Sequence, residues 1–440
     1  MDYSNTSACL LFLTIWLLPF FVRALRNSLR LTLAYWFVTF LHQAVVFANA
    51  LLYATIGSGG DARTFHHRGL GIGQAEIFSL SRAANSTSGE TWGVYENFLG
   101  IVYWLFGPSK MLGQELSVLA FAVSCIILIK IVNLLELSRY GVSILIAYGA
   151  LPSMVLFGSV TLREPYQLLF FMLTVYWGIK MQMKGGINKY LLFMIMSAFA
   201  MGLFHNALVL YAVLLIVLLM TWTLRPVTRF WKITKLRLLA VFFPLVLIGA
   251  YILNGQSIGL GYGYLIGLGG QWLDALFNLD FLQMAEEFRL NSVRKTGRTT
   301  YSANLDLSSL YTTIYSSCKL YLYYLAAPFP WQIKNVLDVG GMIEAFLRMI
   351  LIYFSVKHWC NAYGAQRRIL GLMLILFFSM SFMWAVGTTN YGTAARHHML
   401  SWWILVIAGL PLVMEALSRV RFGLTARKHP HSTGPTEKTF

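Results

Sequence analysis

The chain has 440 residues, of which 58% are hydrophobic and only 12% are charged, and its formal net charge is +17 at pH 7. Soluble domains carry about 25% charged residues, so the composition excludes a soluble globular protein. It also excludes a nucleic-acid-binding domain, because the lysines and arginines form short runs between apolar segments and no single basic face. The chain is predicted to be an integral membrane protein with many spans.

Apolar runs, taken in chain order, predict an all-α polytopic membrane protein with about eleven transmembrane helices and a single domain over 1–440. The predicted spans are 8–22, 31–56, 112–135, 142–160, 165–180, 189–204, 206–222, 238–254, 340–356, 369–387 and 398–417. The apolar run that begins at Lys189 is divided in two, because "FHN" at Phe204–Asn206 interrupts it. Scattered cysteines without CxxC spacing predict neither a disulfide framework nor a metal cluster.

The distribution of lysine and arginine predicts the orientation of these spans. One side receives 21 of the 34 basic residues, including the cluster "RPVTRFWKITKLR" at Arg225–Arg237 and the tail 418–440. That side is expected to be cytoplasmic, with the N-terminus outside and the C-terminus inside. The protein is therefore expected in the plasma (inner) membrane, with two large extracytoplasmic loops at 57–111 and 255–339.

Each large loop is predicted to carry a helix along the membrane surface. The segment Trp92–Gly107 would reach only about 24 Å as a helix, short of the roughly 30 Å hydrocarbon core. The tyrosine-rich segment Leu310–Leu325 has the same interfacial character, and the prolines that follow it end the helix. In the first helix we expect the aromatic side chains to lie at headgroup level: Trp92, Tyr95, Tyr103 and Trp104.

Ionisable residues gather at the predicted outer ends of the spans, where such residues are costly and are functional candidates. Each also has a structural interpretation, as a solvated turn, an interfacial anchor or a histidine bonded to the backbone. The stretches that carry them are "GSGGDARTFHHRGLG", "TLREP", "FHN", "RLNSVRKTGR" and "GTTNYGTAARHH". The candidates in these stretches are Asp61, His66, Arg163, Glu164, His205, Arg294, Arg298 and Arg396.

These residue types indicate a particular chemistry. A carboxylate at the outer surface can act as a general base on an acceptor hydroxyl or amine. Arginines can hold a phosphate or pyrophosphate and stabilise it as a leaving group, and the phosphates buried in membranes are those of lipids. No HxxxH, P-loop or GxSxG motif occurs, so no metal site is predicted, and a divalent cation is left open as a cofactor.

Residues 57 to 180 resemble the GT-C superfamily of integral-membrane glycosyltransferases, which includes protein O-mannosyltransferases and aminoarabinose transferases of lipid A. The similarity lies in "GGDARTFH", in the following "YENFLGIVYWLFGPSKMLGQELSVLAFAVSCIILIKIV", in the acid of the next outer turn, and in the late "GTAARHHMLSWWILVIAG". It implies Asp61 as catalytic base, Glu164 as second acid, and Arg163 and Arg396 as phosphate or substrate contacts. Two features depart from the pattern: an extra N-terminal span, and Phe65, His66 and His67 in place of a second acid or tyrosine.

The sequence thus predicts a glycosyltransferase that moves a sugar from a polyprenyl-(pyro)phosphate carrier to an extracytoplasmic acceptor. Its expected partners are the polyprenyl-linked donor, the bilayer, and a glycan, lipid or protein acceptor, with no nucleic acid. Two alternatives stay open: an O-antigen-type oligosaccharide polymerase or ligase, and a flippase or transporter of lipid-linked sugars. A transporter would show a passage through the bundle instead of one outer cavity. The residues expected to bind the donor phosphate or substrate are Arg163, His205, Arg396, His66, Arg294 and Arg298.

Overall fold

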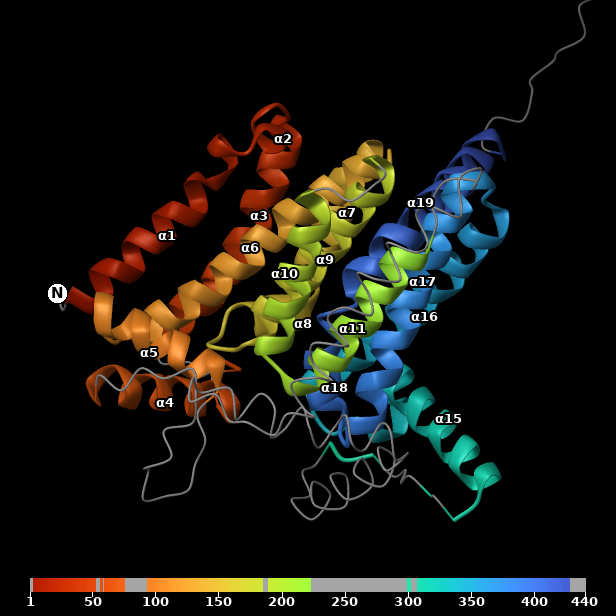
Figure 1. The fold of residues 1–440 in the computed structure, drawn as a ribbon. Helices are drawn as coiled ribbons and strands as arrows, with labels where there is room; N and C mark the ends of the chain where they lie inside the picture. Colours follow the sequence, from red (N-terminus) through yellow and green to blue (C-terminus); the bar gives the residue numbers. More distant parts are fainter. Residues whose placement is uncertain are drawn as a thin grey trace, which may run out of the picture.

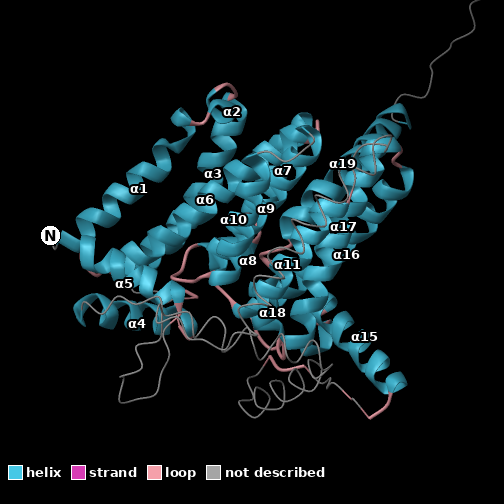
Figure 2. Ribbon diagram, viewed as in Figure 1, coloured by secondary structure: helices cyan, strands magenta, loops and turns pink. Residues whose placement is uncertain are grey.

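The computed structural model describes residues 3–52, 56–57, 59–75, 93–184, 189–222, 299–301, 306 and 308–427. These residues form sixteen α-helices and two short 3-10 helices (Figure 2). Within them the only β-structure is an isolated bridge between Thr300 and Asn390. The fold is all-α, as the sequence predicts.

The helices are, in chain order, α1 (Tyr3–Phe21), α2 (Arg23–Arg26), α3 (Leu29–Leu51), α4 (Asp61–Ala75), α5 (Val94–Phe106), α6 (Lys110–Leu134), α7 (Gly141–Gly149), α8 (Pro152–Gly158), α9 (Glu164–Lys184), α10 (Lys189–Leu203), α11 (Asn206–Thr221), α15 (Leu310–Ala326), α16 (Val336–Asn361), α17 (Gly364–Gly387), α18 (Tyr391–His398) and α19 (Trp402–Arg427). The 3-10 helices are Ser138–Tyr140 and Pro330–Gln332.

Each predicted span within the described residues coincides with a helix or, for 142–160, with the pair α7 and α8; the predicted span 238–254 lies outside them. Five helical segments are long and apolar enough to cross a membrane: Leu29–Leu51, Lys110–Leu134, Asp338–Asn361, Gly364–Gly387 and Trp402–Arg419. The pair α7 and α8, bent by 67°, would be a sixth span. Several long apolar helices indicate an integral membrane protein, whereas the full count of eleven spans goes beyond what these segments show.

The long helices run side by side and alternate in direction (Figure 1). The short helices α4, α5 and α18 gather at one end of the bundle, which we call the α4/α18 end. The opposite end carries α2 and the turn between α16 and α17. The chain turns that the sequence assigns to the outer side of the membrane therefore lie at one end of the molecule.

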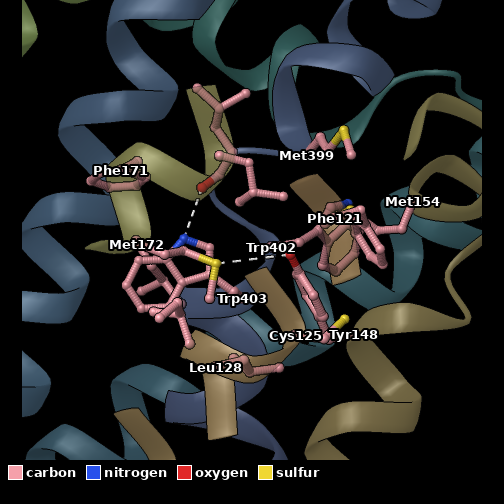
Figure 3. Close-up of a cluster of buried hydrophobic side chains, with 14 of the residues drawn as sticks. Phe121, Cys125, Leu128, Tyr148, Met154, Phe171, Met172, Met399, Trp402 and Trp403 are labelled. Atoms are coloured by element: carbon pink, nitrogen blue, oxygen red, sulfur yellow. Dashed lines mark hydrogen bonds between the residues drawn. The ribbon is translucent and has the colours of Figure 1, made fainter. Parts of the chain in front are cut away.

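The core of the bundle lies where α6, α7 and α9 meet the start of α19 (Figure 3). Trp402 and Trp403, the first residues of α19, are fully buried. The Trp403 ring meets Phe171 of α9 edge-on at 5.6 Å between centroids, and its Nε1–H donates to the Leu400 carbonyl over 2.9 Å. Because the indole also satisfies a backbone carbonyl next to α18, this packing fixes the position of α18 on the bundle.

The first large loop contains two packed helices, where the sequence predicts only one. Helix α4 lies on α5, and the contact is close because a Cβ added at Gly73 would come within 2.9 Å of the Gly100 carbonyl oxygen. Tyr95 and Tyr103 face this contact and are buried, which the sequence does not predict, and their depth at headgroup level stays a prediction. The two tyrosines are eight residues apart in α5, so both lie on the face of the helix that α4 covers. Trp104 is exposed, and Trp92 lies outside the described residues.

Helix α15 begins at a capping box formed by Ser309 and Thr312. It leaves the α4/α18 end at a steep angle to α16 (Figure 1), and its predicted place along the membrane surface stays a prediction. Its last carbonyls are bound from the bundle: Arg348 Nη1 donates to Leu325 O over 2.6 Å, and His398 Nε2 lies 2.8 Å from Tyr324 O. The C-terminal turn of α15 is thereby held against α16 and α18.

Close packing of α7 on α3 yields a first prediction. A Cβ at Gly149 would lie 2.4 Å from Val38 Cγ1, and valine is too stiff to move aside. Gly149→Ala should therefore lower the free energy of unfolding by about 1–3 kcal/mol, as overpacking does. The matched control is Gly340→Ala in α16, where nothing lies within 4 Å of the added atom. Thermal unfolding in detergent that ranks the two variants equally would contradict this packing.

Candidate functional site

Three of the candidate residues meet at the α4/α18 end. Arg396 of α18 donates from Nη1 to Asp61 Oδ2 of α4 over 2.6 Å. Its Nε lies 3.0 Å from Glu164 Oε1 of α9, although the N–H is not directed at that oxygen. One guanidinium therefore pairs with two carboxylates that come from distant parts of the sequence.

Glycines place Asp61 at the start of α4. Gly57 and Gly60 have φ values of +64° and +52°, which side chains other than glycine rarely adopt. Gly57 also packs closely on α8, because an added Cβ would lie 2.7 Å from Leu156 Cδ1. The chain can thus turn sharply from α3 into α4, and the Asp61 side chain remains 54% exposed at the turn.

Glu164 and Arg396 are held from inside the bundle. Glu164 is the first residue of α9 and its side chain is only 1% exposed, so its carboxylate lies near the positive end of the helix dipole. Arg396 lies in the last turn of α18, a helix whose start is capped by Asn390, which accepts from Thr393 N over 2.7 Å. Burial alone lowers the pKa of Arg396, but Glu164 and then Asp61 raise it above its ordinary value. Arg396 therefore remains a cation.

A cavity of about 300 Å³ opens beside this ion cluster. Asp61 and Arg396 both line it, whereas Glu164 lies behind Arg396 and does not. The other lining residues come from the turn before α4, from α8 and its following turn, and from the start of α18: Gly57, Gly59, Gly60, Ala62, Phe157, Leu162, Asn390, Gly392 and Thr393. The cavity therefore offers a ligand one exposed carboxylate and one guanidinium.

Arg163 lies next to this cluster but is not paired like Arg396. Its guanidinium lies 5.6 Å from the centre of the Phe65 ring, and its Nε is buried without a hydrogen-bond partner. Within the described part of the chain, no carboxylate forms a salt bridge with it. No ion pair within the described residues therefore balances its positive charge.

Two neutral histidines stand behind the arginines. His205 accepts from Ala207 N over 3.2 Å as the cap of α11, and its ring meets Trp384 edge-on. His397 stacks on the same Trp384 ring, with 3.8 Å between the ring centroids. Burial lowers the pKa of both histidines well below the ordinary value, and the nearby Arg163 and Arg396 lower it further. His205 therefore lies in the cluster as a neutral cap and does not line the cavity.

His66 faces away from the ion cluster. It lies on the side of α4 that packs on α5, where its Nδ1 is 2.9 Å from the Tyr103 hydroxyl. Burial, with smaller effects of His67 and Lys110, lowers the pKa of His66 to about 4. His66 does not line the cavity, and the structure gives it a contact between two helices.

The second large loop returns to the site at its described end. Tyr301 N donates to Thr389 O over 2.8 Å, and Tyr391 N donates to Thr299 O over 3.1 Å. These bonds hold the chain against the start of α18, at the edge of the cavity. The predicted contacts Arg294 and Arg298 lie outside the described residues, and Arg298 directly precedes this anchored segment.

Several residues of the site escape the sequence analysis. Asn390 and Thr393 stand in the quoted stretch "GTTNYGTAARHH", so their position was visible but not their role as cavity lining. Phe157 and Leu162 belong to an apolar run and carry no signal that separates them from core residues. Among the described residues, no three His, Cys, Asp or Glu side chains gather in a way that could hold a metal ion.

The buried ion pair yields a second prediction. Arg396→Gln leaves the Glu164 carboxylate buried without its cation, which should lower the free energy of unfolding by about 3–5 kcal/mol. Asp61→Asn should cost far less, because the Asp61 side chain is half exposed. Adding Glu164→Gln to Arg396→Gln should restore much of the loss, since no unpaired charge then remains. Chemical unfolding is measured for the unaltered protein, Arg396→Gln, Asp61→Asn and the double variant. A double variant as unstable as Arg396→Gln alone would disprove the coupling between Arg396 and Glu164.

The environment of His66 yields a third prediction. Because the folded pKa of about 4 lies below the unfolded value of about 6.5, the neutral imidazole stabilises the fold fully above pH 6.5. This contribution should be lost as the pH falls from 6.5 towards 4. The melting temperature of His66→Gln should therefore drop less between pH 7.5 and pH 5 than that of the unaltered protein. His67→Gln, at an exposed position on the same helix, should behave like the unaltered protein.

No protein-family model, no curated protein and no solved structure matches this chain. The similarity of residues 57 to 180 to the GT-C superfamily therefore stays a prediction from the sequence.

Proposed function

We propose that this protein is an integral-membrane glycosyltransferase. It moves a sugar from a polyprenyl-phosphate or -pyrophosphate carrier to a glycan, lipid or protein acceptor outside the cytoplasm. The observation that carries the proposal is the exposed Asp61 carboxylate, which lines a cavity at the bundle end while Arg396 holds it in place. A turn between membrane helices does not need clustered ionisable residues, so their gathering at one end of the bundle indicates a functional site.

In this proposal Asp61 is the general base. It is the acid that reaches the cavity, and its free oxygen can take the proton of an acceptor hydroxyl or amine as the sugar is transferred. Glu164 is a positioning residue, because it is buried behind Arg396 and fixes the guanidinium that holds Asp61. The two acids thus have different roles, which follow from their different exposure.

The carrier phosphate is expected at Arg163. Two carboxylates already balance the charge of Arg396, whereas Arg163 has no such partner among the described residues. An arginine with free donors can bind a phosphate by two parallel hydrogen bonds and stabilise it as a leaving group. Arg396 then acts on the reaction mainly by holding Asp61 in place.

The arrangement of the helices supports the proposed topology of eleven spans. The turns before α4, α9, α11 and α18 all lie at the α4/α18 end (Figure 1). In the predicted topology the chain crosses the membrane an even number of times between any two of these turns, so all of them lie on the same side. The basic-residue distribution assigns this side to the exterior. We therefore place the reaction at the extracytoplasmic surface of the plasma membrane.

One observation favours a related enzyme as a second candidate, an oligosaccharide polymerase or ligase. The anchored segment at Thr299 and Tyr301 begins directly after Arg298 and lies at the cavity edge. Such an enzyme would use arginines of the large outer loop to hold its acceptor. A transporter is less well supported, because the described interior next to the site is filled by the aromatic and aliphatic core of Figure 3.

The catalytic role of Asp61 is the fourth prediction. Asp61→Asn keeps the size of the side chain and removes its basicity, so sugar transfer should fall by about 100- to 10,000-fold. The assay is sugar transfer in membranes, which supply the acceptor, measured as release of free carrier from a panel of polyprenyl-monophosphate and -pyrophosphate sugars. Glu415→Gln is the matched control, since Glu415 pairs with Arg139 on the side of the bundle away from the cavity. It should leave transfer unchanged.

The same panel separates the base from the phosphate contact. Asp61→Asn should bind the carrier nearly as well as the unaltered protein, whereas Arg163→Gln should bind it at least about ten-fold more weakly. Arg139→Gln controls for the loss of one positive charge. Near-normal sugar transfer by Asp61→Asn would show that Asp61 is not the base. If changes at Asp61 and at Glu164 both leave transfer unchanged, the glycosyltransferase proposal is wrong.

A further inference from the structure

A second, larger cavity lies near the opposite end of the bundle. It has a volume of about 650 Å³ and forms where the end of α11, the last turns of α16 and the first half of α17 meet. We call it the α16/α17 groove. Its lining residues are Trp222, Val356, Trp359, Gly364, Arg367, Arg368, Gly371, Leu374, Ile375 and Phe378.

The lining of the groove changes from cationic to apolar along α17. Arg367 and Arg368 lie near the start of the helix. Leu374, Ile375 and Phe378 follow towards the middle of the bundle, so the apolar part begins about 10 Å deeper at about 1.5 Å per residue. A ligand that fits this gradient has an anionic end and an apolar body along one line.

Two tryptophans stand at the cationic end. The Trp222 Nε1–H donates to the Arg368 carbonyl over 2.9 Å, and the Arg367 guanidinium lies 5.2 Å from the centre of the Trp359 ring. Gly371 makes room for both rings, because an added Cβ would lie 3.0 Å from Trp359 Nε1 and 3.4 Å from Trp222 Cζ2. Tryptophan side chains are typical of the headgroup level of a membrane, so this end of the groove has the composition of that level.

Among the described residues, no carboxylate balances the positive charge of the groove. No aspartate or glutamate is among the residues that line it, and neither arginine forms a salt bridge within the described residues. The Arg367 guanidinium is oriented by Trp359, which leaves its donors free for an anion. Arginine binds phosphate more specifically than lysine, because its fork of donors matches two phosphate oxygens.

We propose that the α16/α17 groove binds an anionic phospholipid, with the phosphate on Arg367 and Arg368 and an acyl chain along Leu374 and Phe378. Basic pockets between membrane helices on the cytoplasmic side are suited to such headgroups. The basic-residue distribution assigns this end of the bundle to that side. The site does not depend on the proposed transfer reaction, because the Asp61 cavity lies at the α4/α18 end.

The test is lipid retention by the purified full-length protein in detergent, measured by native mass spectrometry. Phosphatidylglycerol is the anionic probe and phosphatidylcholine the neutral one. The unaltered protein should retain phosphatidylglycerol at least about ten-fold better, as expected for hydrogen bonds to a charged group. Arg367→Gln with Arg368→Gln should abolish that preference. The matched control is Arg26→Gln with Arg30→Gln, which removes two exposed arginines at the same end of the bundle.

A second variant tests the apolar part without changing the charge. Ile375→Trp fills the groove beside Leu374 and should lower retention of phosphatidylglycerol while the melting temperature stays near that of the unaltered protein. The proposal is overturned if the unaltered protein retains both lipids equally, or if the control pair lowers retention as much as the Arg367 and Arg368 pair. It is also overturned if millimolar inorganic phosphate displaces the lipid, because the groove would then bind a free anion.

Discussion

The structure of the site depends on one constraint, the cost of burying a carboxylate. Glu164 lies at the start of α9 with almost none of its side chain exposed, and such a group is strongly unfavourable without a cation. Arg396 supplies that cation and also reaches Asp61 in the exposed turn before the cavity. Three helices that are distant in sequence are thereby held in one register by a single guanidinium.

This constraint can be met only because α18 is fixed on both sides. The tryptophans that follow it enter the core beside Phe171, and Asn390 caps its first turn. On the other side, His398 bonds to the C-terminal turn of α15. The ion cluster therefore lies on a rigid frame, whereas Asp61 itself lies on a glycine turn at the surface. Asp61 is exposed to a ligand, and the neighbouring Arg396 is held rigidly. This combination suits a catalytic base.

The two cavities divide the molecule by charge. At the α4/α18 end the cavity is lined by one exposed carboxylate, Asp61, and one guanidinium, Arg396, so a ligand there meets both signs of charge. At the α16/α17 groove only arginines face the ligand, beside two tryptophans. The first environment suits proton transfer near a phosphate, and the second suits the static binding of an anionic headgroup. The difference between the two cavities follows from the charged side chains that the surrounding helices leave facing each of them.

The helical class and the approximate helix bounds could be predicted from the sequence alone, because long apolar runs broken by polar turns admit few other structures in a membrane. The sequence also identified Asp61, Glu164 and Arg396 as residues of one rim. That a single arginine joins both acids is visible only in the folded structure, since the sequence gives no distance between turns 100 or 200 residues apart. The structure also shows that α4 is a helix, that Tyr95 and Tyr103 of α5 are packed beneath it, and that His66 of α4 contacts Tyr103. The glycines and charges of that stretch indicate a loop, and it is the close fit on α5 that stabilises a helix there.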